Sequence, residues 1–268
     1  MQNNKEIECV VGILKGMDGE DILYDYDAVT KLLQNVRKAF DRVVPADKDK
    51  VLLEEALYSA RIEGSQSTLD SITGILENRI AGEPNRDDQM VLNVMRAMNF
   101  AVSYNITEQN IRRIWELLTH NVLNNSSISG KKWRSEMVYL TGNGTIRHTP
   151  EKPDNIEKRM KSLFEYVNGD ADPIIKAIVT QFYFEYVYPF CDGNGCFGRI
   201  WTFDILRKQL FYNVNFVSIS QKIWDKRSEY YNALVMSEVP CGSKIDVTPF
   251  LVFMLEVLQD AACQNGSL

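Results

Sequence analysis

The run VYPFCDGNGCFGRI, residues 187 to 200, contains residue types that can hold phosphates. Two glycines flank Asn194, so that backbone N–H groups can converge on one anion. A helix expected to start near Gly195 would direct its first N–H groups and the positive end of its dipole to the same point. Asp192 offers a hard oxygen ligand for Mg²⁺. Arg199, one helical turn after Gly195, can reach the distal end of a polyphosphate.

Other interpretations of this loop were weighed. A plain corner between two helices, with capping residues, accounts for the same few residues and stays open. A calcium loop is excluded, because counting from Asp192 places Cys196 at position 5 and Phe203 at position 12, where carboxylates are needed. A Walker A loop is excluded because no Gly-Lys-Ser or Gly-Lys-Thr follows. The residues alone therefore leave a phosphate cradle or a corner.

The elements that must position this loop are predicted to be mostly helices. The segment 173 to 188 is apolar almost all round, which predicts a buried central helix. Asn143-Gly144 between two short β-prone runs predicts a hairpin. The fold class expected is therefore all-α, a helical bundle with a small β-hairpin. The other helices are expected over residues 25–41, 46–62, 68–80, 87–104, 108–123, 154–167 and 249–262.

The composition of the whole chain limits its class. With 268 residues and 45% hydrophobic residues, it predicts one large domain or one domain with a modest extension. A formal net charge of −6 disfavours a general nucleic-acid binder. No apolar run is long enough for a membrane span, and no signal peptide is expected. Five widely spaced cysteines without a CxxC pair disfavour a zinc ribbon and predict a cytoplasmic location.

The run YPFCDGNGCFGR resembles the signature of Fic-domain proteins, His-Pro-Phe-x-Asp/Glu-Gly-Asn-Gly-Arg-x-x-Arg. SARIEG, residues 59 to 64, resembles the family's inhibitory-helix pattern, Ser/Thr-x-x-x-Glu-Gly/Asn. GKKWR, the hairpin, RSEYYNAL and DVTPFLVFMLEVL are further landmarks, so the resemblance covers roughly residues 45 to 260. It implies a Fic fold with an N-terminal helical extension at 1–44, a Fic domain at 45–262 with its inhibitory helix at about 46–63, and a tail at 263–268.

The resemblance also implies a reaction. Fic proteins typically transfer AMP from ATP to a hydroxyl of a target protein. By resemblance, Asp192 would hold Mg²⁺, and Arg199 would hold the distal phosphates of ATP. The anion hole for the α- and β-phosphates would be formed by Gly193, Asn194 and Gly195.

Two positions depart from the signature. The histidine that acts as general base is replaced by Tyr188, and the first arginine by Cys196. A tyrosine with a pKa of about 10 is only roughly 0.1% ionised at pH 7, and a lost general base costs about 10² to 10⁴ in rate. A lost charge-assisted hydrogen bond to phosphate costs about 1.5–3 kcal/mol. Weak or absent AMP transfer is therefore expected.

Regulation and target alignment follow from the same resemblance. Glu63, in a motif with Ser59 and Gly64, would pair with Arg199 and block the γ-phosphate. The hairpin would be the flap that aligns the target segment. Its expected residues are Val138, Tyr139, Leu140 and Ile146.

Three hypotheses remain. The first is a degenerate Fic domain that binds a nucleotide, by resemblance ATP with Mg²⁺, or another phosphorylated ligand, and signals by binding. The second is an active transferase of AMP, or of another phosphate-containing group, with an altered mechanism. The third is a signalling or interaction protein without a ligand. An unknown protein target and a possible homo-oligomer are expected as partners, with no membrane and no DNA, since only CQNGSL follows the last expected helix.

Substitute reactive groups were also considered at three positions. Cys196 could be a reactive thiol, because a helix N-terminus lowers thiol pKa values. His148 could face the cleft, although a surface role is favoured, and His120 is expected to be structural or on the surface.

Overall fold

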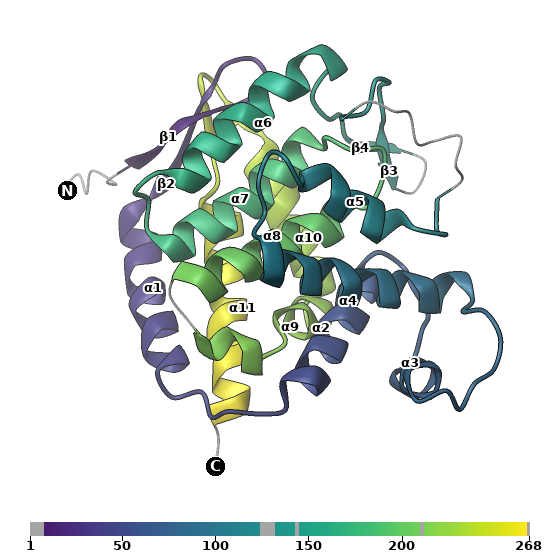
Figure 1. Ribbon diagram of the computed structural model, residues 1–268. Coiled ribbons are helices and arrows are strands. Elements are labelled where there is room, and N and C mark those ends of the chain that lie inside the picture. Colours follow the sequence, from purple (N-terminus) through teal and green to yellow (C-terminus); the bar gives the residue numbers. More distant parts are fainter. Residues whose placement is uncertain (1–7, 124–131, 143–144, 210–211, 267–268) are drawn as a thin grey trace.

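The computed structural model describes residues 8–123, 132–142, 145–209 and 212–266. These residues form a helical body with α7 near its centre and with α3 at its edge (Figure 1). None of the described helices combines the length and apolarity needed to cross a membrane. The helices are α1 Tyr26–Phe40, α2 Lys48–Ile62, α3 Leu69–Leu76, α4 Arg86–Tyr104, α5 Ile111–Thr119, α6 Pro153–Asn168, α7 Pro173–Val187, α8 Asn194–Gln209, the 3-10 helix η2 Tyr212–Phe216, α9 Ile219–Asp225, α10 Arg227–Glu238 and α11 Thr248–Gly266.

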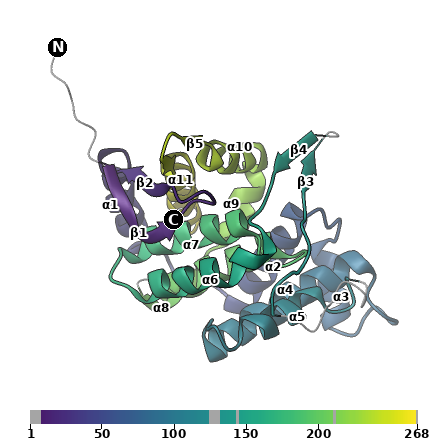
Figure 2. The ribbon, with the colours of Figure 1, turned by 90° about the horizontal axis from the view of Figure 1, so that it is seen from above.

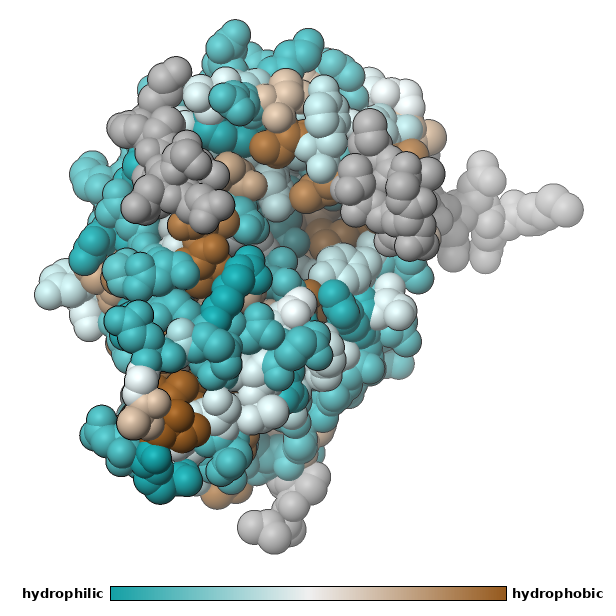
Figure 3. Space-filling view, turned by 90° about the vertical axis from the view of Figure 1, so that its right-hand side faces the viewer, coloured by the Kyte–Doolittle hydropathy of each residue, from teal (hydrophilic) through white to brown (hydrophobic). Residues whose placement is uncertain are grey.

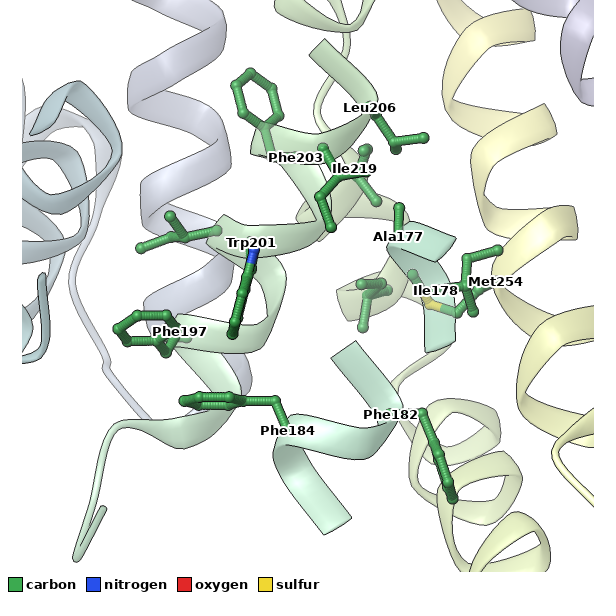
Figure 4. Close-up of a cluster of buried hydrophobic side chains, with 14 of the residues drawn as sticks. Ala177, Ile178, Phe182, Phe184, Phe197, Trp201, Phe203, Leu206, Ile219 and Met254 are labelled. Atoms are coloured by element: carbon green, nitrogen blue, oxygen red, sulfur yellow. The ribbon is translucent and has the colours of Figure 1, made fainter. Parts of the chain in front are cut away.

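The central helix α7 begins at a cap that the sequence supplies. The side chain of Asp172 accepts hydrogen bonds from the backbone N–H groups of Ile174 and Ile175, at 2.9 and 3.3 Å. Aromatic side chains then join α7 to α8: Phe184 stacks on Phe197, with ring centroids 4.8 Å apart, and meets Trp201 edge-on. Figure 4 shows this cluster. The loop between the two helices therefore leaves from one fixed element and enters another.

The helix α2, which carries the predicted inhibitory motif, is part of the core. Ala56, Ala60 and Ile62 are fully buried. The carboxylate of Glu55 accepts hydrogen bonds from the first residues of α9: from the hydroxyl of Ser218 at 2.9 Å, and from the backbone N–H and hydroxyl of Ser220 at 2.8 and 2.6 Å.

The C-terminal end of α2 is held from α10. The carbonyl of Ile62 accepts hydrogen bonds from Arg227 at 3.1 Å and from the Tyr231 hydroxyl at 3.0 Å. At the end of a helix, the last carbonyl groups receive no hydrogen bond from inside the helix. Arg227 and Tyr231 supply donors to one of these carbonyls, so the backbone that leads into Glu63 is held in place.

The expectation of an entirely helical N-terminal extension was wrong. Residues 8–25 form the strands β1 Glu8–Lys15 and β2 Asp21–Asp25, and β2 runs parallel to β6 Lys244–Asp246. The order is β1-β2-β6-β5, with β5 at Pro240–Cys241. Ile22 and its partner Ile245 are both fully buried. The burial of these β-branched side chains against distant parts of the chain favours strands, and no local signal shows that pairing.

The C-terminal end of α11 differs from expectation, and the expected hairpin is present. Helix α11 continues to Gly266, so most of the expected tail at 263–268 is helical. The hairpin is present as β3 Leu140–Gly142 paired antiparallel with β4 Thr145–His148. Its predicted turn, Asn143-Gly144, lies outside the described residues. Figure 2 shows the hairpin standing out from the helical body.

The bond between α2 and α9 gives a first prediction. Glu55→Ala should lower the free energy of unfolding by about 2–4 kcal/mol, because buried donors of α9 lose their acceptor. Urea denaturation followed by circular dichroism measures this. Glu54→Ala, the next residue on the same helix, is the control, since Glu54 is only half-buried and should change stability by about 0.5 kcal/mol or less. Equal stabilities of the two variants would contradict the role given to Glu55.

Candidate functional site

The loop before α8 is closed by the side chain of Asn194. Its Oδ1 accepts from the Phe190 N–H at 3.0 Å, and its Nδ2 donates to the Phe190 carbonyl at 2.9 Å. Trp115 of α5 stacks on Phe190, with ring centroids 4.9 Å apart, and donates from Nε1 to the carbonyl of Asp192 at 2.9 Å. The Asn194 side chain is therefore used to hold the loop, which leaves the backbone to bind ligands.

The space beside Gly195, at the start of α8, is occupied by the side chain of Glu63. The first N–H groups of a helix have no acceptor inside it, and α8 begins at Asn194. A Cβ atom at Gly195 would lie only 2.2 Å from Oε1 of Glu63. The residue must be glycine for this close approach. A carboxylate oxygen thus occupies the space over the predicted phosphate cradle.

The guanidinium of Arg199 is buried and is held by α2. Its Nη2 lies 2.7 Å from Oε1 of Glu63 and donates to the carbonyl of Ser59 at 3.0 Å. Its Nε donates to the Ser59 hydroxyl, also at 3.0 Å. Burial alone would lower the pKa of Arg199, but the Glu63 carboxylate raises it well above its ordinary value. The site therefore contains a permanent positive charge that is only 4% exposed.

One nitrogen of this guanidinium has no hydrogen-bond partner among the described residues. Nη1 of Arg199 is buried and unpaired. It lies 3.2 Å from the position that a Cβ of Gly195 would take. A buried donor without an acceptor is costly, about 1–3 kcal/mol, and this one is next to the glycine of the cradle. The residues present fit a ligand that brings an oxygen acceptor to this point, such as a phosphate.

The proposal that Cys196 is a reactive thiol was wrong. The side chain is 5% exposed, and its sulfur lies 3.6 Å from both the hydroxyl and the carbonyl oxygen of Ser59. Burial raises the pKa of the Cys196 thiol to about 11. The effect of burial outweighs that of the helix N-terminus, so the sulfur stays protonated and inert at neutral pH.

Tyr188 adopts a left-handed backbone conformation, with φ 52° and ψ 63°. Apart from three asparagines, it is the one non-glycine residue of the described chain with positive φ. Burial, with Glu63 and Asp192 nearby, raises the pKa of its phenol further above the ordinary value, and the Asn194 side chain opposes this. A phenolate that could accept a proton is therefore even scarcer than the sequence predicts.

Arg134, in the predicted GKKWR landmark, holds this conformation. Its Nε donates to the carbonyl of Tyr188 at 2.7 Å, and its backbone N–H donates to the carbonyl of Pro189 at 3.0 Å. It also donates to the carbonyls of Glu136 and Glu151. Burial lowers the pKa of this guanidinium. A cation at the C-terminal end of α7 is also favoured by the helix dipole.

His148 is neither in the cleft nor on the surface. Its Nδ1 lies 2.9 Å from a carboxylate oxygen of Glu238, and its Nε2 lies 2.9 Å from the carbonyl of Tyr186. Its side chain is 8% exposed. Through these two contacts, His148 attaches the end of β4 to α7 and α10.

The flap residues are placed only in part. Val138 is half-buried, Tyr139 is 54% exposed and Leu140 starts β3. Ile146 belongs to β4 by its backbone, and its side chain lies outside what the structure describes. Figure 3 shows this side of the molecule as mainly hydrophilic, with hydrophobic side chains in separate small patches.

Asp192 is the candidate cation ligand. Its Oδ1 accepts from the Gly193 N–H at 2.7 Å. Burial raises its pKa, and Glu63 adds to this effect. No group of three or more His, Cys, Asp or Glu residues that could hold a metal occurs within the described ranges. A cation at Asp192 would therefore need further oxygens from a ligand.

Glu185 is a site residue that the sequence analysis missed. It is one turn before Tyr188, and its Oε1 accepts from the hydroxyl of Tyr230 at 2.7 Å and from Gln181 at 3.2 Å. Burial raises the pKa of Glu185 to about 7, opposed by the charge of Arg199. Its signal was present, since it is the one acidic residue in the apolar segment 173–188.

Comparisons with known proteins agree with this geometry. Residues 105–206 match the model of the Fic/DOC family. A protein adenylyltransferase Fic from Nematostella vectensis is 25% identical, over 74% of this chain and 44% of its own length. A Fic family protein of known structure from Desulfovibrio desulfuricans is 25% identical with a TM-score of 0.77, over 88% of this chain and 73% of that one. Fic-1 from C. elegans shares the fold at 19% identity, with a TM-score of 0.68 over 89% and 72%.

These matches, with the loop and the fold, show that the chain contains a Fic domain. The chain spans less than half the length of the curated relative that it matches. The structural relatives are helical, as this fold is.

The half-buried acid Glu185 gives a pH-dependent prediction. Because burial raises the pKa of Glu185 from 4.5 to about 7, the folded chain keeps a proton between these pH values that the unfolded chain has released. The free energy of unfolding therefore falls as pH rises through this range. Relative to Glu185→Gln, the wild type should lose about 1–3 kcal/mol between pH 4.5 and pH 8.

Urea denaturation of both proteins at several pH values measures this difference. Glu165→Gln, at an exposed position of α6, is the control and should follow the wild type at every pH. Parallel curves for the wild type and Glu185→Gln would show that Glu185 ionises normally in the folded protein.

Proposed function

We propose that this chain is a nucleotide-binding Fic protein that holds ATP with Mg²⁺ and transfers AMP weakly or not at all. The observation that carries the proposal is the buried Arg199, whose unpaired Nη1 faces the Gly195 cradle. The helix N-terminus and two converging glycines add backbone donors at the same place. The relative from Nematostella vectensis is a protein adenylyltransferase, which supports ATP as the nucleotide.

The groups that bind and the groups that react are different residues here. Binding would use Arg199 and the backbone N–H groups at the start of α8, whereas the Gly193 N–H donates to the Asp192 side chain. The reaction would use a base at position 188, where the phenol has a raised pKa. Without a base, the proton of an attacking hydroxyl has no acceptor, which costs about 10²–10⁴ in rate. The proposal is therefore binding with residual chemistry at most.

Asp192 would hold Mg²⁺, which supplies charge neutralisation for the phosphates when it is bound. The Asp192 side chain is exposed and lines the cavity beside the cradle. Its carbonyl is fixed by Trp115, so the residue is oriented before any ligand arrives.

Glu63 would control access. Its carboxylate lies against Arg199 and over Gly195, where a phosphate oxygen would bind. The backbone of α2 is fixed by the core, whereas the Glu63 side chain is 33% exposed. Opening would therefore be a rotation of this side chain. The protein target, if one exists, would approach along the flap, which is attached to α7 through Arg134 and His148.

Glu63→Gly should raise the affinity for ATP by about 10-fold or more. The substitution removes the carboxylate that competes with a phosphate for the guanidinium of Arg199. Isothermal titration calorimetry with Mg²⁺ measures the affinity. The matched control is Glu77→Gly, since Glu77 is also the C-terminal cap of a helix, α3, with nearly the same φ. An affinity equal in wild type and Glu63→Gly would overturn the inhibitory role.

Tyr188→His combined with Cys196→Arg should create self-modification in the Glu63→Gly background. The histidine restores a base with a pKa of about 6.5, and the arginine restores a phosphate contact. Intact-protein mass spectrometry after incubation with Mg²⁺ and ATP should show added AMP on the triple variant and little on Glu63→Gly alone. Efficient transfer by Glu63→Gly alone would show that the native site needs no histidine.

A further inference from the structure

A cavity lies next to Cys196, where the longer arginine of the family signature would extend. Its volume is about 80 Å³, enough for two or three water molecules. Glu63, Asp192 and Cys196 line one side. Apolar residues of α4 and α5, among them Met90 and Leu118, line the other. The substitution by a short side chain has left space, and it has removed a charge from a site that is expected to bind phosphates.

Arg86 lines the same cavity from the start of α4. It is exposed, and in the part of the chain that the structure describes it forms no ion pair. Its Nη1 contacts the sulfur of Met90 at 3.8 Å. A cation in the first turn of a helix is disfavoured by the helix dipole, so no local interaction explains its place.

The geometry assigns Arg86 as the residue that holds the distal phosphate of the ligand, in place of the arginine absent at position 196. This inference rests on the proposed function. Arg199 lies against Glu63 from α8, and Arg86 shares a cavity with Glu63 from α4. When the Glu63 side chain leaves, the two guanidiniums flank one open position. A group there would be a second or third phosphate, so the ligand class is a nucleoside diphosphate or triphosphate.

A binding experiment tests this assignment without any need for catalysis. Affinities for ATP, ADP and AMP are measured by calorimetry in the Glu63→Gly background, with and without Arg86→Gln. Arg86→Gln should weaken ATP and ADP by about 10-fold or more, because a charge-assisted contact to phosphate is lost. AMP, which has no distal phosphate, should stay within about 2-fold. The control is Arg96→Gln, which changes an exposed arginine of the same helix and should alter none of the affinities.

A rescue distinguishes a direct contact from a general loss of charge. Cys196→Arg added to Arg86→Gln should restore ATP affinity, because it places a guanidinium in the same cavity. Unchanged ATP binding by Arg86→Gln, or an equal loss for AMP and ATP, would overturn the assignment and leave the proposed function standing. Failure of Glu63→Gly to bind any of the three nucleotides would overturn both.

Discussion

The buried charge of Arg199 is the constraint on which the rest of the site depends. An ionised side chain that is 4% exposed needs compensation. Helix α2 supplies it with one carboxylate, one hydroxyl and one carbonyl, from Glu63 and Ser59. Consistent with this requirement, α2 is held at its middle, by Glu55 on α9, and at its C-terminal end, by α10 on the Ile62 carbonyl. A mobile α2 would leave the guanidinium uncompensated.

Because the charge is permanent, the site always favours an anion. In the closed arrangement that anion is Glu63, a residue of the chain itself. A phosphate that replaces Glu63 would give Arg199 the same compensation and would also reach the unpaired Nη1. In the closed arrangement and in the proposed liganded one, the buried charge of Arg199 would therefore have an anionic partner. Neither arrangement depends on a base at position 188, so the proposed binding does not require the proposed chemistry.

The sequence predicts the parts of this site that are contiguous. The loop from Asp192 to Gly195 and the SARIEG segment carry recognisable patterns, so the expectation that Glu63 meets Arg199 comes from motifs alone. The sheet could not be predicted, because β2 pairs with β6, more than two hundred residues later. Arg134 and Glu185 act through long-range contacts with backbone carbonyls and with Tyr230. A single sequence does not show such contacts, although one acid in an apolar helix is a usable signal.

The burial of Ser59 and the exposure of Glu63 determine which of these two residues could move away from Arg199. Ser59 is 2% exposed and is bonded to Arg199, so it cannot leave without the helix. The Glu63 side chain is 33% exposed and follows the last residue of α2, next to Gly64 with φ +98°. The step that opens the cradle is then local, the rotation of one side chain about a fixed backbone. Under the proposed function, such a rotation would need only an anion that binds Arg199 better than a carboxylate does. A polyphosphate carries more charge and more acceptor oxygens than a carboxylate, so on this proposal the ligand itself would open the site.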